Sequence, residues 1–194
     1  MKIYYVANIR WPTSKAHGIQ LAKMSEALIE AGAGLTLVVP NRGRGDAQAF
    51  YGLRQSIPTI QVPVLNFGDN WLGFNLSALS FAVSSFLFLF FRRLEKNAVI
   101  YTIDLDNFSF FLLPFLGRLV FSEVHGSKQL SFFSKIFFRK VSGIVAVSEG
   151  VKSSLIKNFN LSPEKIIVCP NGIDFKMFEN LPTTEAVRQK LNFP

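Results

Sequence analysis

Residues 143–174 read GIVAVSEGVKSSLIKNFNLSPEKIIVCPNGID, and the order of residue types in this stretch is the clearest indication of the fold class. An apolar run over 143–148 is followed by a segment of helical character over 149–160. A second apolar run over 165–170 ends in the turn Pro170-Asn171-Gly172. Apolar runs separated by a helix are typical of neighbouring strands in a parallel sheet covered on both faces. The stretch therefore predicts a strand–helix–strand unit that ends in a tight turn.

The same alternation extends back to the N-terminus. We expect further strands at 3–8, 35–40, 60–66, 98–103 and 119–125, and helices at 18–32, 71–91, 107–117 and 128–141. Residues 41–54 are polar and contain three glycines, so we expect a loop there. The predicted fold class is α/β, with a doubly wound, mostly parallel sheet. In such sheets ligands bind beyond the carboxyl ends of the strands.

Residues that closely follow the predicted strands are therefore the candidate site. They are Asn8, Arg10, Lys15, His17, Gly18, Asp104, His125, Ser127, Ser148 and Asn171. A glycine at the start of helix 18–32 lets a phosphate approach free backbone N–H groups, and the basic residues just before it add to that attraction. The imidazole of His125 is suited to a hydrogen bond with a sugar hydroxyl or a phosphate.

Several of these residues also have a purely structural interpretation. Gly18 is equally suited to a chain reversal, and His125 to a hydrogen bond with the local backbone. Ser148 is placed to cap the helix at 149–160. Asp104-Leu105-Asp106 has the D-x-D pattern that can hold a metal ion and a nucleotide diphosphate, and an N-cap role explains it as well.

Common cofactor motifs are absent from the sequence. The turn after the first strand lacks the G-x-G-x-x-G of dinucleotide sites, and no Walker A sequence occurs. Two His and one Cys are too few for an ordinary zinc site without carboxylates. We therefore expect no cofactor and no bound metal.

The chain is basic, with 21 Lys or Arg residues against 13 Asp or Glu residues. This excess favours a polyanionic partner, namely nucleic acid, anionic lipid or a phosphorylated small molecule. The basic residues lie beside apolar helices rather than among exposed aromatic residues on strands, which disfavours nucleic acid and favours a membrane surface. The single Cys169 suits a reducing, cytoplasmic compartment.

Two predicted helices bear on membrane contact. Helix 128–141 is a candidate for docking on a membrane. The residues concerned are Phe132, Phe133, Phe137 and Phe138 with Lys135, Arg139 and Lys140. The alternative is that half of these phenylalanines belong to the core. Segment 71–91 is uncharged and long enough to span a bilayer. A spanning helix there would separate strands of one sheet, so we expect a buried helix, or one with a face in the membrane interface.

Residues 143–174 also resemble the end of the N-terminal domain of family 4 glycosyltransferases, retaining enzymes with the two-domain GT-B architecture. The shared pattern is a strand, Ser-x-x-hydrophobic on a helix, and Lys-Ile-x-Val-x-Pro-Asn-Gly-hydrophobic-Asp. KAHGIQLAKMSEALIEAGAGLTLVVP at 15–40 resembles the family's first βαβ unit. VFSEVH at 120–125 resembles the strand that ends in its active-site His.

The resemblance implies transfer of a sugar from a nucleotide sugar to a glycan or lipid-linked hydroxyl, with retention at the anomeric carbon, in cell-surface polysaccharide or glycolipid synthesis. It implies that His125 is catalytic, that Gly18 lies near the donor diphosphate, and that the protein is peripheral on the inner face of the membrane. The family holds its nucleotide sugar mainly in a second Rossmann-like domain. We therefore expect residues 1–175 to form the acceptor-side domain, and 176–194 to lead toward a C-terminal donor domain that this chain lacks.

Two other readings stay open at this point. The chain is also compatible with a metal-dependent, single-domain glycosyltransferase that uses Asp104 and Asp106. A non-catalytic half of a split glycosyltransferase, which brings a separate donor-binding subunit to the membrane, is the second alternative.

Overall fold

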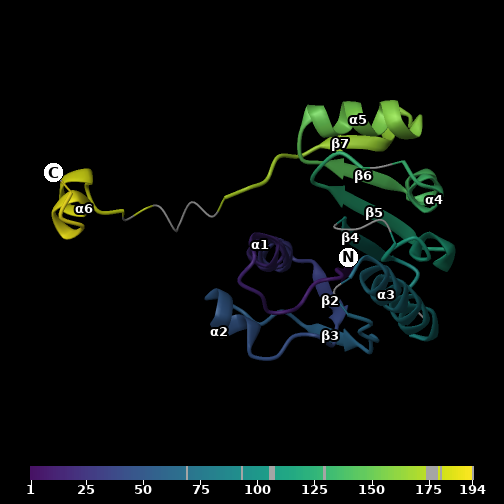
Figure 1. The fold of residues 1–194 in the computed structure, drawn as a ribbon, viewed down its shortest axis with the longest axis horizontal. Helices are drawn as coiled ribbons and strands as arrows, with labels where there is room; N and C mark the ends of the chain where they lie inside the picture. The colour runs from purple at the N-terminus through teal and green to yellow at the C-terminus, as the bar shows by residue number, and fades with distance from the viewer. Residues whose placement is uncertain are drawn as a thin grey trace.

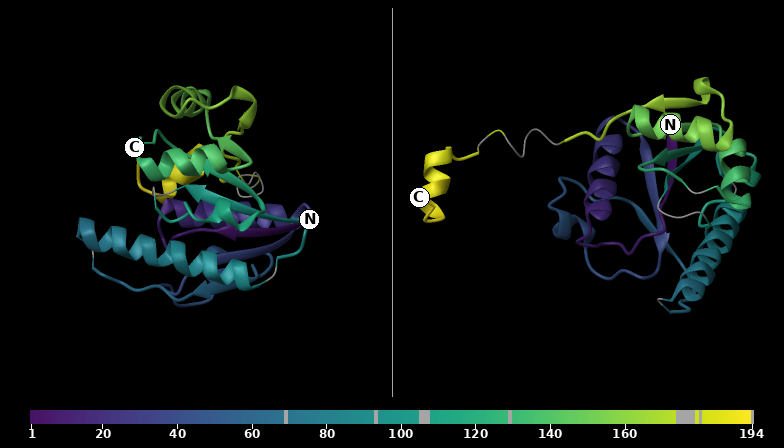
Figure 2. Two further views of the ribbon diagram at one scale, coloured as in Figure 1. Left: turned by 90° about the vertical axis from the view of Figure 1, so that its right-hand side faces the viewer. Right: turned by 45° about the horizontal axis from the view of Figure 1, so that its top comes forward.

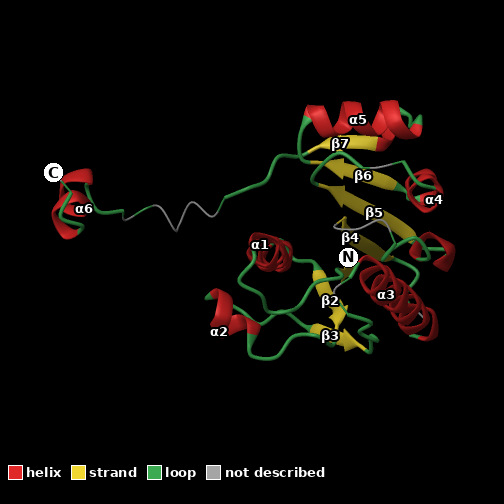
Figure 3. Ribbon diagram, viewed as in Figure 1, coloured by secondary structure: helices red, strands yellow, loops and turns green. Residues whose placement is uncertain are grey.

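One parallel sheet organises the structure, a computed structural model that describes residues 1–68, 70–92, 94–104, 108–128, 130–173, 179 and 181–193, with only the backbone of Asp104. Seven strands lie in the order β3-β2-β1-β4-β5-β6-β7, and every pair of neighbours is parallel (Figures 1 and 3). The strands are β1 (Lys2–Val6), β2 (Gly34–Pro40), β3 (Thr59–Val62), β4 (Ala98–Asp104), β5 (Leu119–Val124), β6 (Gly143–Ala146) and β7 (Ile166–Val168). The predicted fold class is confirmed.

The strand order reverses at β1, which has β2 on one side and β4 on the other. Loops that leave neighbouring strands at such a reversal diverge to opposite faces of the sheet and leave space for a ligand between them. The residues that follow β1, β4 and β5 are therefore the ones placed to form a site.

Helices cover the two faces unequally (Figure 2). Helix α1 packs on one face of β1 and β2, where Tyr5, Leu21 and Leu37 are fully buried, with the short helix α2 beside it. The other face is covered by α3, the 3-10 turn η1, α4 and α5, with Phe81, Phe138 and Phe159 in its core. The bounds are α1 (Ala16–Glu30), α2 (Ala47–Tyr51), α3 (Trp71–Phe91), η1 (Leu113–Leu116), α4 (Phe132–Lys140), α5 (Glu149–Phe159), a second 3-10 turn η2 (Pro163–Lys165) and α6 (Thr184–Lys190).

Local sequence explains where several helices begin and end. Helix α4 begins with a capping box in which Ser131 and Ser134 exchange side-chain and backbone hydrogen bonds. The Ser148 hydroxyl caps α5 by accepting from the Val151 N–H at 3.3 Å, as predicted. Helix α5 ends at Phe159 and is followed by its C-cap Asn160, which has the left-handed conformation (φ 51°) that asparagine tolerates.

The structure differs from the sequence-based expectation in four places. Residues 41–54 are not all loop, because the Asp46 side chain caps α2 and Gly52 ends it with a positive φ of 61°. The helix expected over 107–117 is reduced, in the described part, to turns and the 3-10 turn η1, where Pro114 removes a backbone donor. Strand β3 ends before Pro63 rather than at residue 66. Helix α1 begins at Ala16, two residues before Gly18.

Helix α3 passes the length and composition test for a membrane span, and it is the one helix of the described chain that does so. It has 21 residues and a mean hydropathy of 1.8 in its most apolar window, of which 33% is buried inside the protein. Its position between β3 and β4 and its contacts with β3 and η1 make it a layer of the domain. Helix α6 stands apart from the sheet in Figures 1 and 2.

Phe81 gives a direct test of which side of α3 faces the core. Its side chain is fully buried and meets the Phe110 ring edge-on at 6.3 Å, whereas Phe74 on the same helix is 52% exposed. We expect Phe81→Ala to lower the free energy of unfolding by about 3–5 kcal/mol, because it leaves a cavity. Phe74→Ala, the matched control, should change it by less than about 0.5 kcal/mol. Urea denaturation followed by circular dichroism measures both, and equal losses would contradict this packing.

Candidate functional site

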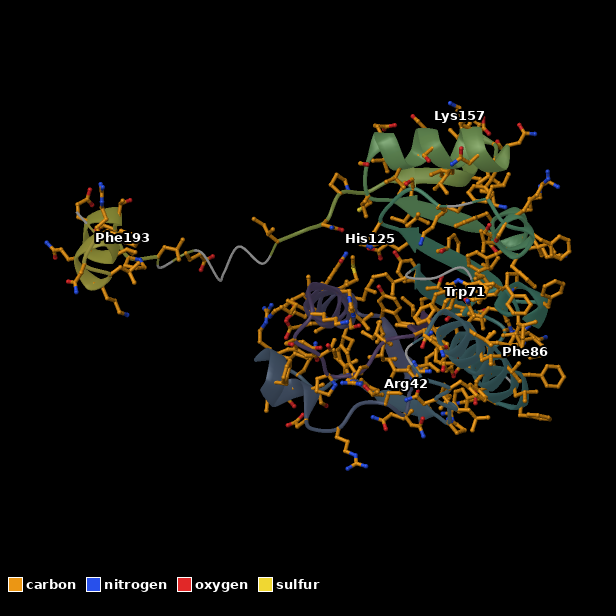
Figure 4. All side chains as sticks on the ribbon, viewed as in Figure 1. Arg42, Trp71, Phe86, His125, Lys157 and Phe193 are labelled. Carbon is orange, nitrogen blue, oxygen red and sulfur yellow. The ribbon has the colours of Figure 1, made fainter. Side chains whose placement is uncertain are left out.

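His125 directly follows β5 at the carboxyl edge of the sheet, where Figure 4 labels it. Its Nε2 lies 2.8 Å from Oε1 of Glu123, two residues earlier on the same strand. Residues two apart on a strand point to the same face. The His125 side chain is half-buried and Glu123 is buried, so this pair connects the interior of the sheet to its surface.

Two tyrosines hold the other oxygen of the Glu123 carboxylate. The Tyr101 hydroxyl on β4 donates to Oε2 at 2.9 Å, and the Tyr5 hydroxyl on β1 approaches the same oxygen at 3.5 Å. Tyr5 and Tyr101 are opposite each other in the register, with their rings 5.0 Å apart. Burial, and after it the Glu123 charge, raises the pKa of both hydroxyls well above the usual tyrosine value. Both hydroxyls therefore stay protonated and act as donors.

These contacts fix which nitrogen of His125 carries a proton. An ionised carboxylate only accepts hydrogen bonds, so Nε2 donates to Glu123. Gln20 also meets His125 through Nε2, at 3.3 Å. Within the described residues, Nδ1 is thus the ring nitrogen left for a ligand. The arrangement resembles other sites in which a carboxylate fixes the tautomer of a working imidazole.

Gln20 joins His125 to the last strand–turn unit of the domain. From the first turns of α1, its amide nitrogen donates to the Asn171 Oδ1 at 3.0 Å and approaches Glu123 Oε1 at 3.4 Å. Asn171 and His125 are 46 residues apart in sequence, yet one side chain contacts both. The predicted convergence of His125 and Asn171 at one edge is therefore found. We call Tyr5, Gln20, Tyr101, Glu123, His125 and Asn171 the Glu123 cluster.

The glycine of the first βα loop has a packing role in this structure. The Gly18 N–H donates to the Lys15 carbonyl at 2.8 Å, so that group is already used. A Cβ at Gly18 would lie 2.4 Å from Thr13 Cγ2 and 2.6 Å from the Tyr51 hydroxyl, which leaves no room for a side chain. Gly18 is thus required for close packing in the first turn of α1 rather than for a chain reversal, and its part in phosphate binding stays a prediction.

Lys15 and His17 flank this turn. Lys15 is exposed at the N-cap of α1. Partial burial, and then the Lys15 charge, lowers the pKa of His17 from its ordinary value of 6.5. At neutral pH His17 is therefore uncharged. At the start of α1, His17 thus provides a neutral hydrogen-bonding group and Lys15 provides the positive charge.

The remaining candidates lie around the same edge with different surroundings. Asn8 donates to the Ser109 hydroxyl at 2.7 Å and so joins the end of β1 to the segment after β4. Arg10 and Ser127 are exposed, and Ser148 is engaged as the cap of α5. The side chain of Asp104 and all of Asp106 lie outside the described residues, so the D-x-D hypothesis is not tested. Elsewhere in the described chain, no group of three or more His, Cys, Asp or Glu side chains could hold a metal ion.

Four members of the Glu123 cluster were not among the candidate residues predicted from the sequence: Tyr5, Gln20, Tyr101 and Glu123. Glu123 carried a usable signal, because it is the one charged residue inside an otherwise apolar and hydroxylic strand and lies two positions before His125. The sequence gives no signal that Gln20 belongs to the site, because polar residues are common on amphipathic helices.

Comparison with known proteins supports the fold. The chain is similar to a glycosyltransferase from Rickettsia africae ESF-5 (TM-score 0.65, 16% identity, 100% of this chain and 50% of that one). It is similar to sucrose-phosphate synthase from Thermosynechococcus elongatus (TM-score 0.66, 14% identity, 100% and 53%). A third similar structure is the lipopolysaccharide outer core galactosyltransferase WaaB (TM-score 0.57, 16% identity, 90% and 47%). The chain thus spans about half the length of each. No curated protein sequence matches it.

The sheet order and these structural matches define a Rossmann-like domain of the kind that forms the N-terminal half of GT-B glycosyltransferases. The sequence profile of Glycosyltransferase Family 4 matches residues 18–176. The chain belongs to this family, which confirms the resemblance seen in the sequence. It carries the N-terminal domain of a family 4 glycosyltransferase.

The tautomer of His125 can be observed directly. In long-range ¹H–¹⁵N spectra of the 194-residue chain, we expect His125 to carry its proton on Nε2, because Glu123 accepts from that nitrogen. His17, the second histidine, serves as an internal reference.

Two variants separate this contact from a general effect of charge. Glu123→Leu should lower the fraction of the Nε2–H form toward that of a free imidazole, whereas Glu95→Leu, at an exposed glutamate, should leave it unchanged. A wild-type His125 that carries its proton on Nδ1 alone would contradict the geometry, even where the Glu123 variant fails to fold.

Proposed function

We propose that the chain is the acceptor-side domain of a retaining glycosyltransferase, which moves a sugar from a nucleotide sugar to a hydroxyl of a glycan or lipid-linked acceptor. The observation that carries this proposal is the Glu123 cluster at the carboxyl edge of the sheet, whose members other than Tyr5 lie inside the segment matched by the family 4 profile. A half-buried imidazole with one nitrogen held by a buried carboxylate is built to present the other nitrogen to a ligand.

The proposed chemistry needs few functional groups from this domain. The bond between the anomeric carbon and the diphosphate oxygen breaks, and the acceptor oxygen bonds to the same face of that carbon. The acceptor proton passes to the leaving diphosphate. The domain must then orient the acceptor and supply hydrogen bonds where charge develops. No metal ion or cofactor is needed for this step.

The roles of the residues follow from their places in the structure. The Nδ1 of His125 hydrogen-bonds the transferred sugar, Glu123 holds the imidazole, and Gln20 holds Asn171 beside it. Lys15 attracts the donor diphosphate from the start of α1. Gly18 and His17 are proposed to lie beside the donor diphosphate with Lys15. The acceptor pocket is proposed to draw on Asn8, Arg10, Asp104, Ser127 and Ser148.

We propose that a second α/β domain holds most of the nucleotide sugar, because the chain spans about half of the matched structures. We propose a cytoplasmic location because the single cysteine, Cys169, is exposed and forms no disulfide. A free thiol suits a reducing compartment where nucleotide sugars occur. A pathway in cell-surface polysaccharide or glycolipid synthesis fits such an enzyme.

Calorimetry on the 194-residue chain tests whether the nucleotide sugar is bound mainly by the proposed second domain. We expect nucleotide sugars to bind with a Kd above about 1 mM and no sugar to be transferred, because the donor contacts lie on the second domain. Micromolar binding would contradict this. A manganese-dependent gain in affinity that Asp104→Asn removes would favour the metal-dependent alternative instead.

The role of His125 is tested in the enzyme encoded by the complete reading frame. His125→Asn should lower kcat by about 100-fold or more, since an interaction made in the transition state is lost. Lys96→Asn, at an exposed lysine that precedes β4, is the control and should leave kcat unchanged. Product formation from labelled donor gives kcat, and NMR of the new linkage shows whether the anomeric configuration is retained. Inversion, or a His125 variant with wild-type kcat, would overturn the proposal.

A further inference from the structure

Helix α3 distributes its side chains between its inner and outer faces in the opposite way to an ordinary surface helix. Its buried positions are mostly small or hydroxylic, with Gly73, Ser77, Ala78, Ala82 and Ser85 facing the domain beside Phe81 and Leu89. Its outward positions are large and apolar. A soluble helix normally turns its large apolar side chains inward and covers its outer face with charge. Nothing in the described chain covers the outer face of α3.

The outward residues form one continuous stripe. Leu72, Leu76, Leu79, Val83, Leu87 and Phe90 are all exposed. They recur at spacings of three or four residues, which places them on one side of a helix. We call these six residues the α3 stripe. Trp71 at the start of the helix and Phe91 at its end are 80% and 74% exposed, and the Phe86 ring projects from the margin of the molecule in Figure 4.

Hydrogen bonds hold the inner side of α3 to the segment after β3. The hydroxyls of Ser77 and Ser80 accept from the N–H groups of Phe67 and Leu65, at 3.1 and 3.0 Å. Ser84 donates to the Pro63 carbonyl at 2.6 Å. A Cβ on Gly73 would come within 2.3 Å of the Phe67 carbonyl oxygen, so the same segment lies directly against the first turn. These contacts keep α3 on the domain and oppose its crossing of a bilayer.

Basic groups lie beside the stripe. Arg92 directly follows α3, and its guanidinium is 5.8 Å from the centre of the Phe88 ring. Lys140 lies 4.9 Å from the centre of the exposed Phe115 ring, on the η1 turn that packs against α3. Between residues 70 and 140 the sequence has eight Lys or Arg residues and four Asp or Glu residues. An open groove at the end of the helix is lined by Pro63, Ser84, Leu87, Phe88, Phe91 and Arg92.

We propose that the α3 stripe docks the domain on an anionic phospholipid bilayer, with α3 lying in the plane of the interface. The apolar stripe enters the boundary between headgroups and acyl chains, and Arg92 and Lys140 pair with lipid phosphates. The groove offers an apolar floor to one acyl chain, with the Arg92 guanidinium at its rim. A helix about 30 Å long contacts many lipids at once.

A bilayer suits this surface better than a helical partner protein. Paired helices normally carry charged residues beside their apolar seam, and these set the register and the partner. Helix α3 has no charged residue from 71 to 91, and its exposed positions outside the stripe are the aromatic residues Trp71, Phe74 and Phe91. The surface therefore fits an apolar phase bordered by negative charge. It has no charged residues that would fix the register of a partner helix.

The predicted docking helix was α4, and the structure corrects this in part. Phe137 and Phe138 are buried in the core, so they are not available to a membrane. Phe132 and the basic residues of α4 are exposed, and Lys140 adjoins the α3 surface through Phe115. Helix α4 thus contributes its charges, while α3 provides the apolar contact.

Trp71 allows a test without any substitution. The chain has two tryptophans, and Trp11 is buried, so a change in emission on vesicle binding reports Trp71. We expect a blue shift with phosphatidylcholine vesicles that contain phosphatidylglycerol, and quenching by brominated acyl chains. Trp71→Phe should remove both signals. Vesicle binding needs neither donor nor acceptor, so this test is independent of the proposed sugar transfer.

Substitutions in the stripe give a second measurement. Leu79→Asp and Val83→Asp should each weaken partitioning in co-sedimentation by at least about tenfold, because an apolar side chain no longer enters the lipid. Leu191→Asp, at an exposed leucine on the C-terminal side of α6, is the matched control and should bind as the wild type does. Arg92→Ser should lose about fivefold on anionic vesicles and little on neutral ones.

The proposal is overturned if the wild-type chain binds neither kind of vesicle. It is also overturned if the chain forms a dimer in sedimentation velocity that Leu79→Asp dissociates, without any vesicle binding. The stripe would then be a protein interface.

Discussion

The buried carboxylate of Glu123 imposes the strictest condition on this domain. An isolated carboxylate inside a protein costs several kcal/mol, so it must be surrounded by donors. Here one oxygen faces Tyr5 and Tyr101 and the other faces His125 and Gln20. These donors come from two strands, the residue that follows β5, and one helix. The site at the surface therefore depends on the register of the sheet beneath it, because a slip of one residue between β4 and β5 would turn Glu123 to the other face.

The fold was largely predictable from the sequence because continuous apolar runs and helical segments alternate along it. His125 and Asn171 were predictable for a related reason, since residues that follow parallel strands meet at one edge. The contacts of Gln20 and Gly18 could not be predicted in this way. Gln20 reaches partners more than 100 residues away in sequence, and Gly18 is explained by Thr13 and by Tyr51, 33 residues downstream. Such neighbours follow from tertiary packing, which local pattern does not contain.

The inner and outer faces of α3 could not be told apart from sequence for a different reason. A helix that is apolar all round gives no preferred direction to burial. What orients α3 is its few hydroxyls, which satisfy backbone groups in the segment after β3, together with a glycine where that segment presses against the helix. Polar groups that need partners thus turn inward and leave the large apolar side chains outside. Helix α4 shows the ordinary case, in which Phe137 and Phe138 turn to the core and Arg139 and Lys140 to solvent.

Topology relates the α3 stripe to the Glu123 cluster. A helix that connects two parallel strands runs opposite to them, so α3 begins at the sheet edge where the strands end, as Figure 2 shows. Trp71 therefore lies at the same edge as His125, and Arg92 at the far one. A domain resting on lipid along α3 would hold the edge that carries His125 beside the bilayer rather than facing away from it. The hydroxyl of a lipid-linked acceptor stays close to the headgroups, so this orientation favours such an acceptor over a soluble glycan.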